Sequence, residues 1–416
     1  MNAHVKMLVG VVAGALAGLV WRLLPGDGYW LGLFIEYVTQ PVGQVFLRLL
    51  FMLIVPLLFS AVVMGVCGLE IKKVGRIGLR TLGYTVVVST IAVLIGLVLV
   101  NVLRPGAGLP DELRELAKQT AAIVAVPKPP DTKAVTQFVQ MVPDNVLKSA
   151  ANGDMIGLIV FSLLFALAMS FVDTAASKRL RDVIEGLYDV MMKMIDGVLK
   201  LAPVGVAALL FNMTARFGFD MMKPLFSYVG VVLLGLSIHM FVVYSLSVRF
   251  LGGMSPLHFF SACRLAIVTA FATASSSATL PTAIKVAEEN LKLQPHISRF
   301  VLTAGSAMNQ NGTALFEGVT VLFLAQLFGV ELPLTQQIVI MFICILGGIG
   351  TAGVPAGSLP VVAMILGMFG IPPEGLGLVL GIDRFLDMCR TTLNVTGDLA
   401  AAVYVAKHEE SVPSRG

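Results

Sequence analysis

The polar side chains with the clearest chemistry in this sequence lie in one apolar stretch near the C-terminus, Gly381 to Asp398. An ionised side chain at the centre of a bilayer costs at least ~2.5 kcal/mol, so such residues must face protein, water or a ligand. At about 100° per residue of helix, five of them fall within roughly 60° of one stripe, and two more flank it. The five are Asp387, Arg390, Thr391, Asn394 and Asp398, and the flanking pair is Asp383 and Arg384. One face of this helix is therefore expected to be a binding surface.

Two of these side chains suit opposite ends of one small ligand. Arg390 offers a planar fork of donors that fits a carboxylate, and Asp387, one turn earlier, fits an ammonium group. A ligand that carries both groups is implied. The alternative is a structural salt bridge, because Asp387 and Arg390 stand three residues apart on the helix.

The composition excludes a soluble globule. Of 416 residues, 57% are hydrophobic and 13% are charged, which leaves too little polar surface. Several apolar stretches of about twenty residues predict membrane-spanning helices and not a barrel. The four cysteines (Cys67, Cys263, Cys344 and Cys389) have no CxxC spacing and read as small buried side chains, with no disulfide or metal site. Nothing indicates a nucleic-acid partner.

The hydrophobic pattern predicts six simple spans before residue 252. They cover about 7 to 24, 42 to 68, 79 to 103, 153 to 173, 190 to 216 and 224 to 250. Basic residues crowd the loops after the second and fourth spans, which places these loops and the N-terminus in the cytoplasm. These residues are Lys72, Lys73, Arg76 and Arg80, and then Lys178, Arg179 and Arg181. The polar, proline-bearing segment 104 to 150 is expected to be an external loop.

From about residue 255 the apolar stretches are interrupted by small and polar residues. The interruptions are Ala274 to Pro281, Gly347 to Pro360, and, between them, Gly305 to Gly318. The first two predict helix, non-helical tip and returning helix, and the third predicts a helix broken in its middle. Non-helical backbone survives at membrane depth only inside protein or beside a cavity, so these breaks indicate a site near mid-membrane. The alternatives are small residues that merely allow close helix packing, and a glycine kink at the third break.

These stretches closely resemble the glutamate transporter family, the dicarboxylate and amino acid:cation symporters. The resemblance covers nearly the whole chain and is most specific from about 255 to 405. It rests on the serine-rich tip Ser275-Ser-Ser277, on Asn309-Gln-Asn-Gly-Thr313 where the family has Asn-Met-Asp-Gly-Thr, on Gly350-Thr-Ala-Gly-Val-Pro355, and on Asn394-Val-Thr-Gly-Asp398.

The resemblance implies an all-α integral membrane fold with eight transmembrane helices, two re-entrant helical hairpins and inverted repeats. It also implies a homotrimer whose transport domains move like elevators. Residues 1–252 would mainly form the trimerisation scaffold, although the third and sixth spans would move with the transport domain. Residues 253–408 would form the transport core of hairpin 1, span 7, hairpin 2 and span 8, and 409–416 a cytoplasmic tail.

By the same resemblance, Arg390 pairs with the side-chain carboxylate of aspartate or glutamate, and Asp387 with the α-amino group. The remaining substrate contacts would come from Ser276, Ser277, Thr313, Val354, Thr391 and Asn394. Family members for neutral amino acids lack this arginine and those for plain C4-dicarboxylates lack this aspartate, so an acidic amino acid is implied. Many prokaryotic members place an arginine where this chain has Ala274, whereas Arg384 matches the animal transporters.

The coupling ion is where the chain departs from the family. Asn311, Gln310 and Ala307 replace an aspartate, a methionine and a threonine, which puts two of three family sodium sites in doubt. On the third span, Thr85 and Val88 stand for a tyrosine and a threonine, and only Ser89 is retained. The remaining sodium site keeps its residue types: Asp398 with carbonyls of Gly305, Asn309 and Asn394.

Glu317 is the expected proton carrier. It follows Ala314, Leu315 and Phe316, where a desolvated carboxyl favours its protonated form. By resemblance, its proton exchanges against the arginine that Arg384 matches. The alternative is a permanent Glu317–Arg384 ion pair. His239, within the sixth span, is expected to be a polar residue with satisfied hydrogen bonds, and the alternative is a minor contribution to proton coupling.

The sequence thus predicts a secondary active symporter for glutamate or aspartate, coupled to protons with reduced or absent sodium dependence. It would lie in the cell inner membrane as a multi-pass protein in contact with lipid, with both termini cytoplasmic and no cofactor. The alternatives are a sodium-coupled symporter that uses fewer sodium ions and, more distantly, an anion channel. An intramembrane hydrolase using Ser275 to Ser277 is not expected, because no histidine or lysine base stands at recognisable spacing.

Overall fold

The structure, a computed structural model, describes residues 3–23, 28–67, 75–107, 142–152, 155–218, 222–350 and 358–410. Helices make up nearly all of these residues, and no strand occurs among them. Within this described part, four helices are long and apolar enough to cross a membrane: Arg76–Leu103, Lys223–Leu251, Pro256–Thr273 and Pro295–Phe328. The expected all-helical class is confirmed for these residues, and the apolar helices fit an integral membrane protein.

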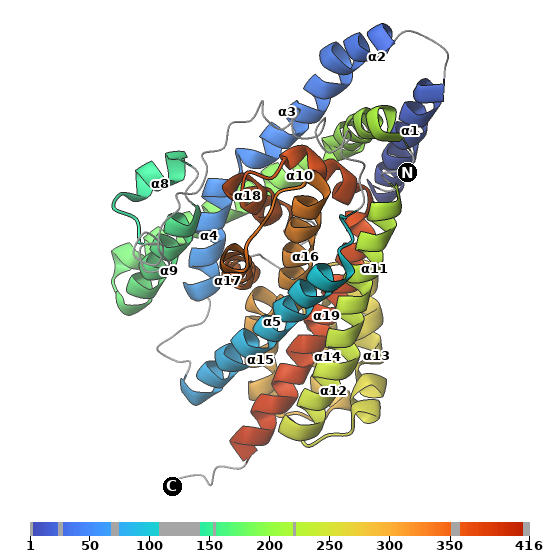
Figure 1. Ribbon diagram of the computed structural model, residues 1–416. Helices are drawn as coiled ribbons and strands as arrows, with labels where there is room; N and C mark the ends of the chain where they lie inside the picture. Colours follow the sequence, from blue (N-terminus) through green and yellow to red (C-terminus); the bar gives the residue numbers. More distant parts are fainter. Residues whose placement is uncertain are drawn as a thin grey trace.

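The described part of the chain begins with five helical elements, whose middle part extends from the body (Figure 1). They are α1 (Ala3–Leu23), α2 (Gly28–Phe34), the π-helical turn η1 (Ile35–Thr39), α3 (Gln40–Phe51) and α4 (Ile54–Cys67). The span expected at 42 to 68 is not one continuous helix, because α3 and α4 are separated at Met52 and Leu53. Pro56, in the first turn of α4, has no N–H to donate to Met52 O, so the helical ladder from α3 cannot continue through it.

The next helices are α5 (Gly75–Leu103), α8 (Val146–Asn152), α9 (Met155–Phe171) and α10 (Ala175–Phe217). The basic residues expected in loops are partly helical: Arg76 and Arg80 begin α5, and Lys178, Arg179 and Arg181 lie in α10. Thr174 explains the early start of α10, because its side chain accepts a hydrogen bond from Ser177 N and caps the helix. Lys72 and Lys73 lie outside the described residues, as does the segment 108–141 of the expected external loop.

Three glycines on one face of α1 bring it close to α10. A Cβ at Gly14 would lie 2.6 Å from Ala207 Cα, and Gly10 and Gly18 abut Pro203 and Thr214 in the same way. Their spacing of four residues is the small-residue pattern that lets apolar helices approach closely in a membrane. The N-terminal helix is therefore held by backbone proximity along α10.

The sixth expected span is one long rod with two π-helical turns. It consists of α11 (Met222–Ile238), η3 (His239–Val243), α12 (Tyr244–Leu246) and η4 (Ser247–Leu251). The helices that follow are α13 (Pro256–Thr273), α14 (Ser276–Lys285), η5 (Val286–Asn290), α15 (Pro295–Met308), α16 (Asn311–Phe328), α17 (Leu334–Gly350), α18 (Leu359–Met368), the short 3-10 turn η6 (Pro373–Gly375) and α19 (Leu376–Glu410).

The three expected breaks differ in extent. At the first, only Ala274 and Ser275 are non-helical, so the expected break to Pro281 is too long. Ala274 takes φ 48°, and the Ser275 side chain caps α14 by accepting from Ala278 N. At the second, α17 continues to Gly350, past the expected start at Gly347, and residues 351–357 lie outside the described part. At the third, the break is confirmed at Asn309 and Gln310, between α15 and α16.

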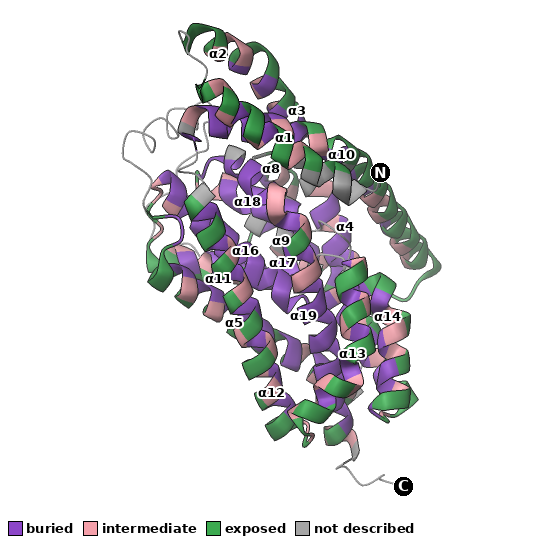
Figure 2. Ribbon diagram, turned by 90° about the vertical axis from the view of Figure 1, so that its right-hand side faces the viewer, coloured by how far each residue is buried: buried purple, intermediate pink, exposed green. Residues whose placement is uncertain are grey.

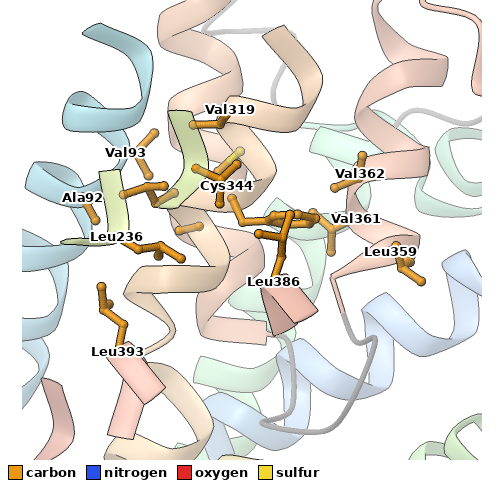
Figure 3. Close-up of a cluster of buried hydrophobic side chains, with 14 of the residues drawn as sticks. Ala92, Val93, Leu236, Val319, Cys344, Leu359, Val361, Val362, Leu386 and Leu393 are labelled. Carbon is orange, nitrogen blue, oxygen red and sulfur yellow. The ribbon is translucent and has the colours of Figure 1, made fainter. Parts of the chain in front are cut away.

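The core lies around α16 and α19. Figure 2 shows buried residues concentrated on α16, α17 and α19, whereas α2, α12 and α13 carry exposed ones. Helix α19 contacts α5, α10, α11, α13, α14, α15 and α16. Apolar side chains from six helices meet in one cluster, including Val93, Leu236, Val319, Cys344, Val362 and Leu386 (Figure 3). The charged stripe of α19 is therefore enclosed by packed helices.

The outer surface of these helices is apolar as well. Val87, Val98 and Val102 of α5 and Phe226 of α11 are each more than half exposed. Such side chains are unfavourable in water over a contiguous surface and suit contact with lipid chains.

Candidate functional site

A chain of four charged residues runs along α19. Arg390 Nη1 lies 2.9 Å from Asp383 Oδ1, and Arg390 Nη2 lies 3.0 Å from Asp387 Oδ1. Arg384 Nη1 continues the chain, 3.5 Å from Asp387 Oδ2. Two guanidinium groups and two carboxylates give this chain a formal net charge of zero. Asp383, Asp387 and Arg390 are buried, which is tolerated because each charge has an opposite neighbour.

Arg390 is the most enclosed of the four, with 1% of its surface exposed. Its guanidinium carbon also stands 4.1 Å from the centre of the Phe316 ring on α16, a cation–π contact favoured for arginine. The salt bridge that the sequence left open as an alternative is thus present. A ligand carboxylate that binds Arg390 has to share the guanidinium with these two protein carboxylates or displace one.

Asp383 was assigned only a flanking place by the sequence analysis. Its pairing with Arg390 spans seven residues, or about two helical turns, which brings the two side chains to the same face. That spacing is the signal that could have identified it.

Arg384 joins α19 to the first helix break. Besides Asp387, its Nη2 donates to the carbonyl of Thr273 at 3.5 Å, next to Ala274. This is the tip where the resemblance expects an arginine in many prokaryotic relatives. The side chain of Arg384 therefore reaches that tip from α19.

The serine tip brings only part of the expected set to the interior. Ser276 is buried and its hydroxyl has no hydrogen-bond partner among the residues that the structure describes, whereas Ser277 is exposed on α14. Ser275 caps the helix. Thr391 is buried on α19, and Val354 lies outside the described residues.

The break between α15 and α16 lies directly against α19. A Cβ at Gly312 would be 2.7 Å from Arg390 O and 3.0 Å from Arg390 Cα, so only glycine permits this approach. Asn394 Oδ1 accepts from Gly312 N at 2.8 Å, and Asn394 Nδ2 donates to Gln310 Oε1 at 2.5 Å and to Thr313 Oγ1 at 3.1 Å. Thr313 and Asn394, two expected substrate residues, are thus in direct contact.

Glu317 lies fully inside the protein, one turn and a half after the break. It is 0% exposed, and neither oxygen of its carboxyl has a hydrogen-bond partner among the described residues. A Cβ at Gly347 of α17 would be 3.5 Å from Glu317 Oε2. Arg384 donates to Asp387 and Thr273 and makes no hydrogen bond to Glu317, so the alternative of a Glu317–Arg384 ion pair is wrong for this structure. A buried carboxyl without a partner is favoured in its neutral form.

The residues expected to hold a sodium ion converge at Asp398. Asn309 Nδ2 donates to Asp398 Oδ1 at 2.9 Å, and a Cβ at Gly305 would lie 2.5 Å from the same oxygen. Asn309 Oδ1 is buried and has no hydrogen-bond partner in the described part of the chain. Asn394 lies one turn before Asp398. A carboxylate beside an unused amide oxygen is a donor set that suits a hard cation.

Asn311, which stands where the resembled family has an aspartate, has its amide bonded within the protein. Asn311 Oδ1 accepts from Ser89 Oγ at 2.5 Å, and Asn311 Nδ2 donates to Tyr244 Oη at 3.0 Å. Thr85 Oγ1 is buried on α5, one turn before Ser89, and has no hydrogen-bond partner within the described ranges. The amide of Asn311 is thus satisfied by two side chains of the protein itself.

His239 corrects one expectation. It is fully buried in η3, and neither ring nitrogen has a hydrogen-bond partner in the described part of the chain. Its ring stands edge-on to Tyr244, with centroids 4.8 Å apart. The expected satisfied histidine is therefore wrong, because the π-helical turn directs the ring against an aromatic neighbour.

Comparison with known proteins supports the family resemblance over nearly the whole chain. The profile of the sodium:dicarboxylate symporter family matches residues 3–408. The chain is 32% identical over 407 residues to the proton/sodium-glutamate symport protein of Bacillus subtilis, covering 97% of this chain and 92% of that protein. It is 33% identical over 414 residues to the proton/glutamate-aspartate symporter of Escherichia coli, covering 97% and 92%. A C4-dicarboxylate transport protein of Laribacter hongkongensis is 31% identical over 416 residues, covering 99% and 91%.

Proposed function

Because this chain belongs to the sodium:dicarboxylate symporter family, we propose that it is a symporter that takes up glutamate or aspartate with protons. The observation that carries this proposal is the buried Arg390, flanked by two aspartates and lying against a helix break. The relatives named for glutamate or for glutamate and aspartate transport match over nearly their full length. With this function the protein would be a transporter and not an enzyme.

The substrate would be held at both ends. Arg390 binds the side-chain carboxylate in exchange for one of its aspartate partners, and Asp387 binds the α-amino group. Thr313, Thr391 and Asn394 complete the site together with the two tips, at Ser276 and Ser277 and at Val354. Support comes from the contact between Thr313 and Asn394, and from the reach of Arg384 to Thr273.

Charge balance explains why a cation must travel with this substrate. The ion-pair chain of α19 is neutral, and an acidic amino acid carries one net negative charge. Burying that charge without compensation is unfavourable. Glu317, buried and unpartnered, supplies the compensation by taking up a proton, and Arg384 neutralises its carboxylate once that proton is released.

A second candidate keeps one sodium ion. Asp398, Asn309 and Gly305 converge, and Asn309 Oδ1 is unused; with carbonyls of Gly305, Asn309 and Asn394 these residues would bind sodium as a co-transported ion. This favours a proton-coupled transporter with one sodium site over one with none. An anion channel is a more distant alternative, which concentrative uptake would exclude.

The architecture that accompanies this function is part of the proposal. Eight spans and two re-entrant hairpins, α13–α14 and α17–α18, form inverted repeats in a multi-pass protein of the inner membrane with both termini in the cytoplasm. Residues 1–252 mainly form the scaffold of a lipid-embedded homotrimer, with the third and sixth spans moving with the core. Residues 253–408 form that core, which moves like an elevator, and 409–416 form a tail. The exposed apolar face of α5 supports contact with lipid.

The test is uptake of radiolabelled glutamate and aspartate into proteoliposomes, with proton and sodium gradients imposed separately. Accumulation driven by an inward proton gradient without sodium is the expected result. Uptake that requires sodium and ignores the pH gradient would refute proton coupling. A failure of either amino acid to enter or to compete would refute the substrate assignment.

A further inference from the structure

The helix break at Asn309 and Gln310 leaves backbone groups without helical partners on both sides. The last carbonyl groups of α15 have no helical N–H to accept from, and the first N–H groups of α16 have no helical carbonyl to donate to. Two side-chain amides satisfy one group on each side. Gln310 Nε2 donates to Ser306 O at 3.1 Å, and Asn394 Oδ1 accepts from Gly312 N at 2.8 Å.

These two amides also bind each other. Asn394 Nδ2 donates to Gln310 Oε1 at 2.5 Å, so one directional chain of hydrogen bonds crosses the break by way of α19. Both amide orientations are determined by backbone atoms, since a carbonyl only accepts and an N–H only donates. If either amide were rotated by 180°, its oxygen would face another acceptor and its nitrogen another donor.

The same oxygen of Gln310 reaches Thr313. Thr313 Oγ1 donates to Gln310 Oε1 at 3.3 Å and accepts from Asn394 Nδ2 at 3.1 Å. All three side chains are buried. Gln310 therefore sets which way the amide of Asn394 and the hydroxyl of Thr313 point.

We propose that Gln310 is a positioning residue for substrate binding, which orients Asn394 and Thr313 and closes the helix break with hydrogen bonds from within the chain. This inference rests on the proposed function, because it takes Asn394 and Thr313 as substrate contacts. Without the carboxamide, Ser306 O and one Nδ2 proton of Asn394 lose their partners in a buried place. The substrate then has to align these groups itself, which weakens its binding more than it slows the loaded carrier.

The experiment compares the full-length protein with Gln310→Met, which keeps the length of the side chain and removes its amide. Initial rates of aspartate uptake give KM and the maximal rate separately. We expect KM to rise by about tenfold, the equivalent of about 1.4 kcal/mol, with a smaller change in the maximal rate per folded protein. Gln310→Asn, which draws the amide back by one carbon, is expected to raise KM as well and serves if the methionine variant does not fold.

Gln326→Met is the matched control. Gln326 lies on the same helix, and its amide also joins two backbone groups, Val100 O at 3.1 Å and Gly106 N at 3.2 Å. Its replacement should lower the thermal stability yet leave KM unchanged. A KM for both Gln310 variants equal to that of the parent, or a KM raised equally by Gln326→Met, overturns the inference. If the parent itself fails to transport aspartate, the proposed function fails instead.

Discussion

Arg390 illustrates at the scale of one residue how a buried charge can be both stable and available. Two carboxylates on its own helix accept hydrogen bonds from its Nε and Nη1, and an aromatic ring covers its face. Its Nη2 has no hydrogen-bond partner among the described residues. Removing the guanidinium altogether would take from buried Asp383 the cation it pairs with and leave Asp387 with Arg384, which is costly to stability. The informative change is therefore one that keeps the charge and alters its shape.

Arg390→Lys is expected to leave the protein folded and to raise the KM for aspartate by at least about tenfold. A lysine has no planar fork, so it cannot bind Asp383, Asp387 and a substrate carboxylate in the same geometry. Loss of one charged hydrogen bond corresponds to about 1.5–3 kcal/mol, and about 1.4 kcal/mol is a factor of ten. Uptake kinetics in proteoliposomes measure this. An unchanged KM would show that the charge alone matters.

His239 presents the opposite case, a buried polar ring with no polar partner. His239→Phe removes two unsatisfied nitrogens and keeps the edge-on contact with Tyr244. We expect the melting temperature in detergent to be unchanged or higher. A clear drop would indicate that a ring nitrogen has a partner essential to stability, and aspartate uptake by the same variant reports whether that partner is used in transport.

At the scale of elements, the site depends on how closely α16 approaches α19. Gly312 lies against the backbone of Arg390, and Gly305 lies against Asp398, so both halves of the broken helix touch the charged helix without an intervening side chain. This proximity allows Asn394 to reach the first turn of α16.

Gly312→Ala tests that proximity. The added methyl group would lie 2.7 Å from Arg390 O, and overpacking of this kind costs typically ~1–3 kcal/mol. We expect a lower melting temperature and weaker aspartate binding. Gly83→Ala is the control, since Gly83 lies in α5 with open space around it, where alanine should be neutral or stabilising by roughly 0.5–1 kcal/mol. Equal effects of the two substitutions would contradict the role given to Gly312.

The sequence was informative about elements where composition and spacing decide the outcome. The break at Asn309 and Gln310 and the polar face of α19 followed from residue types alone. The division of α3 from α4 depended on Pro56, and the early start of α10 on the cap at Thr174, which a hydropathy pattern does not register. The seven-residue spacing of Asp383 and Arg390 could have indicated their pairing. The amide chain through Gln310 could not be predicted, because it depends on side-chain orientation between helices.

At the scale of the whole molecule, two parts of the chain differ in how they are held together. Helix α1 lies against α10 through glycines, with little room for change. The region around α19 is held by buried polar pairs and a cluster of apolar side chains from six helices. The coupling of proton movement to substrate movement has to be measured on the whole protein in a membrane, because it depends on both the empty and the loaded transporter.

Glu317→Gln is the prediction for that scale. Glutamine keeps the size of the side chain but cannot bind and release a proton, so proton-driven accumulation should be abolished while exchange of internal for external aspartate persists. Proteoliposomes with and without a pH gradient provide both measurements. Accumulation equal to that of the parent would exclude Glu317 as the proton carrier.

The neutral chain of Asp383, Arg390, Asp387 and Arg384 has an electrical consequence for such a cycle. A membrane potential does about 2.3 kcal/mol of work per 100 mV on each elementary charge moved across the bilayer, and on this quartet that work sums to zero. A movement of the quartet as one body would therefore add no voltage dependence of its own, whereas the charges of the cargo, of Glu317 and of Asp398 would.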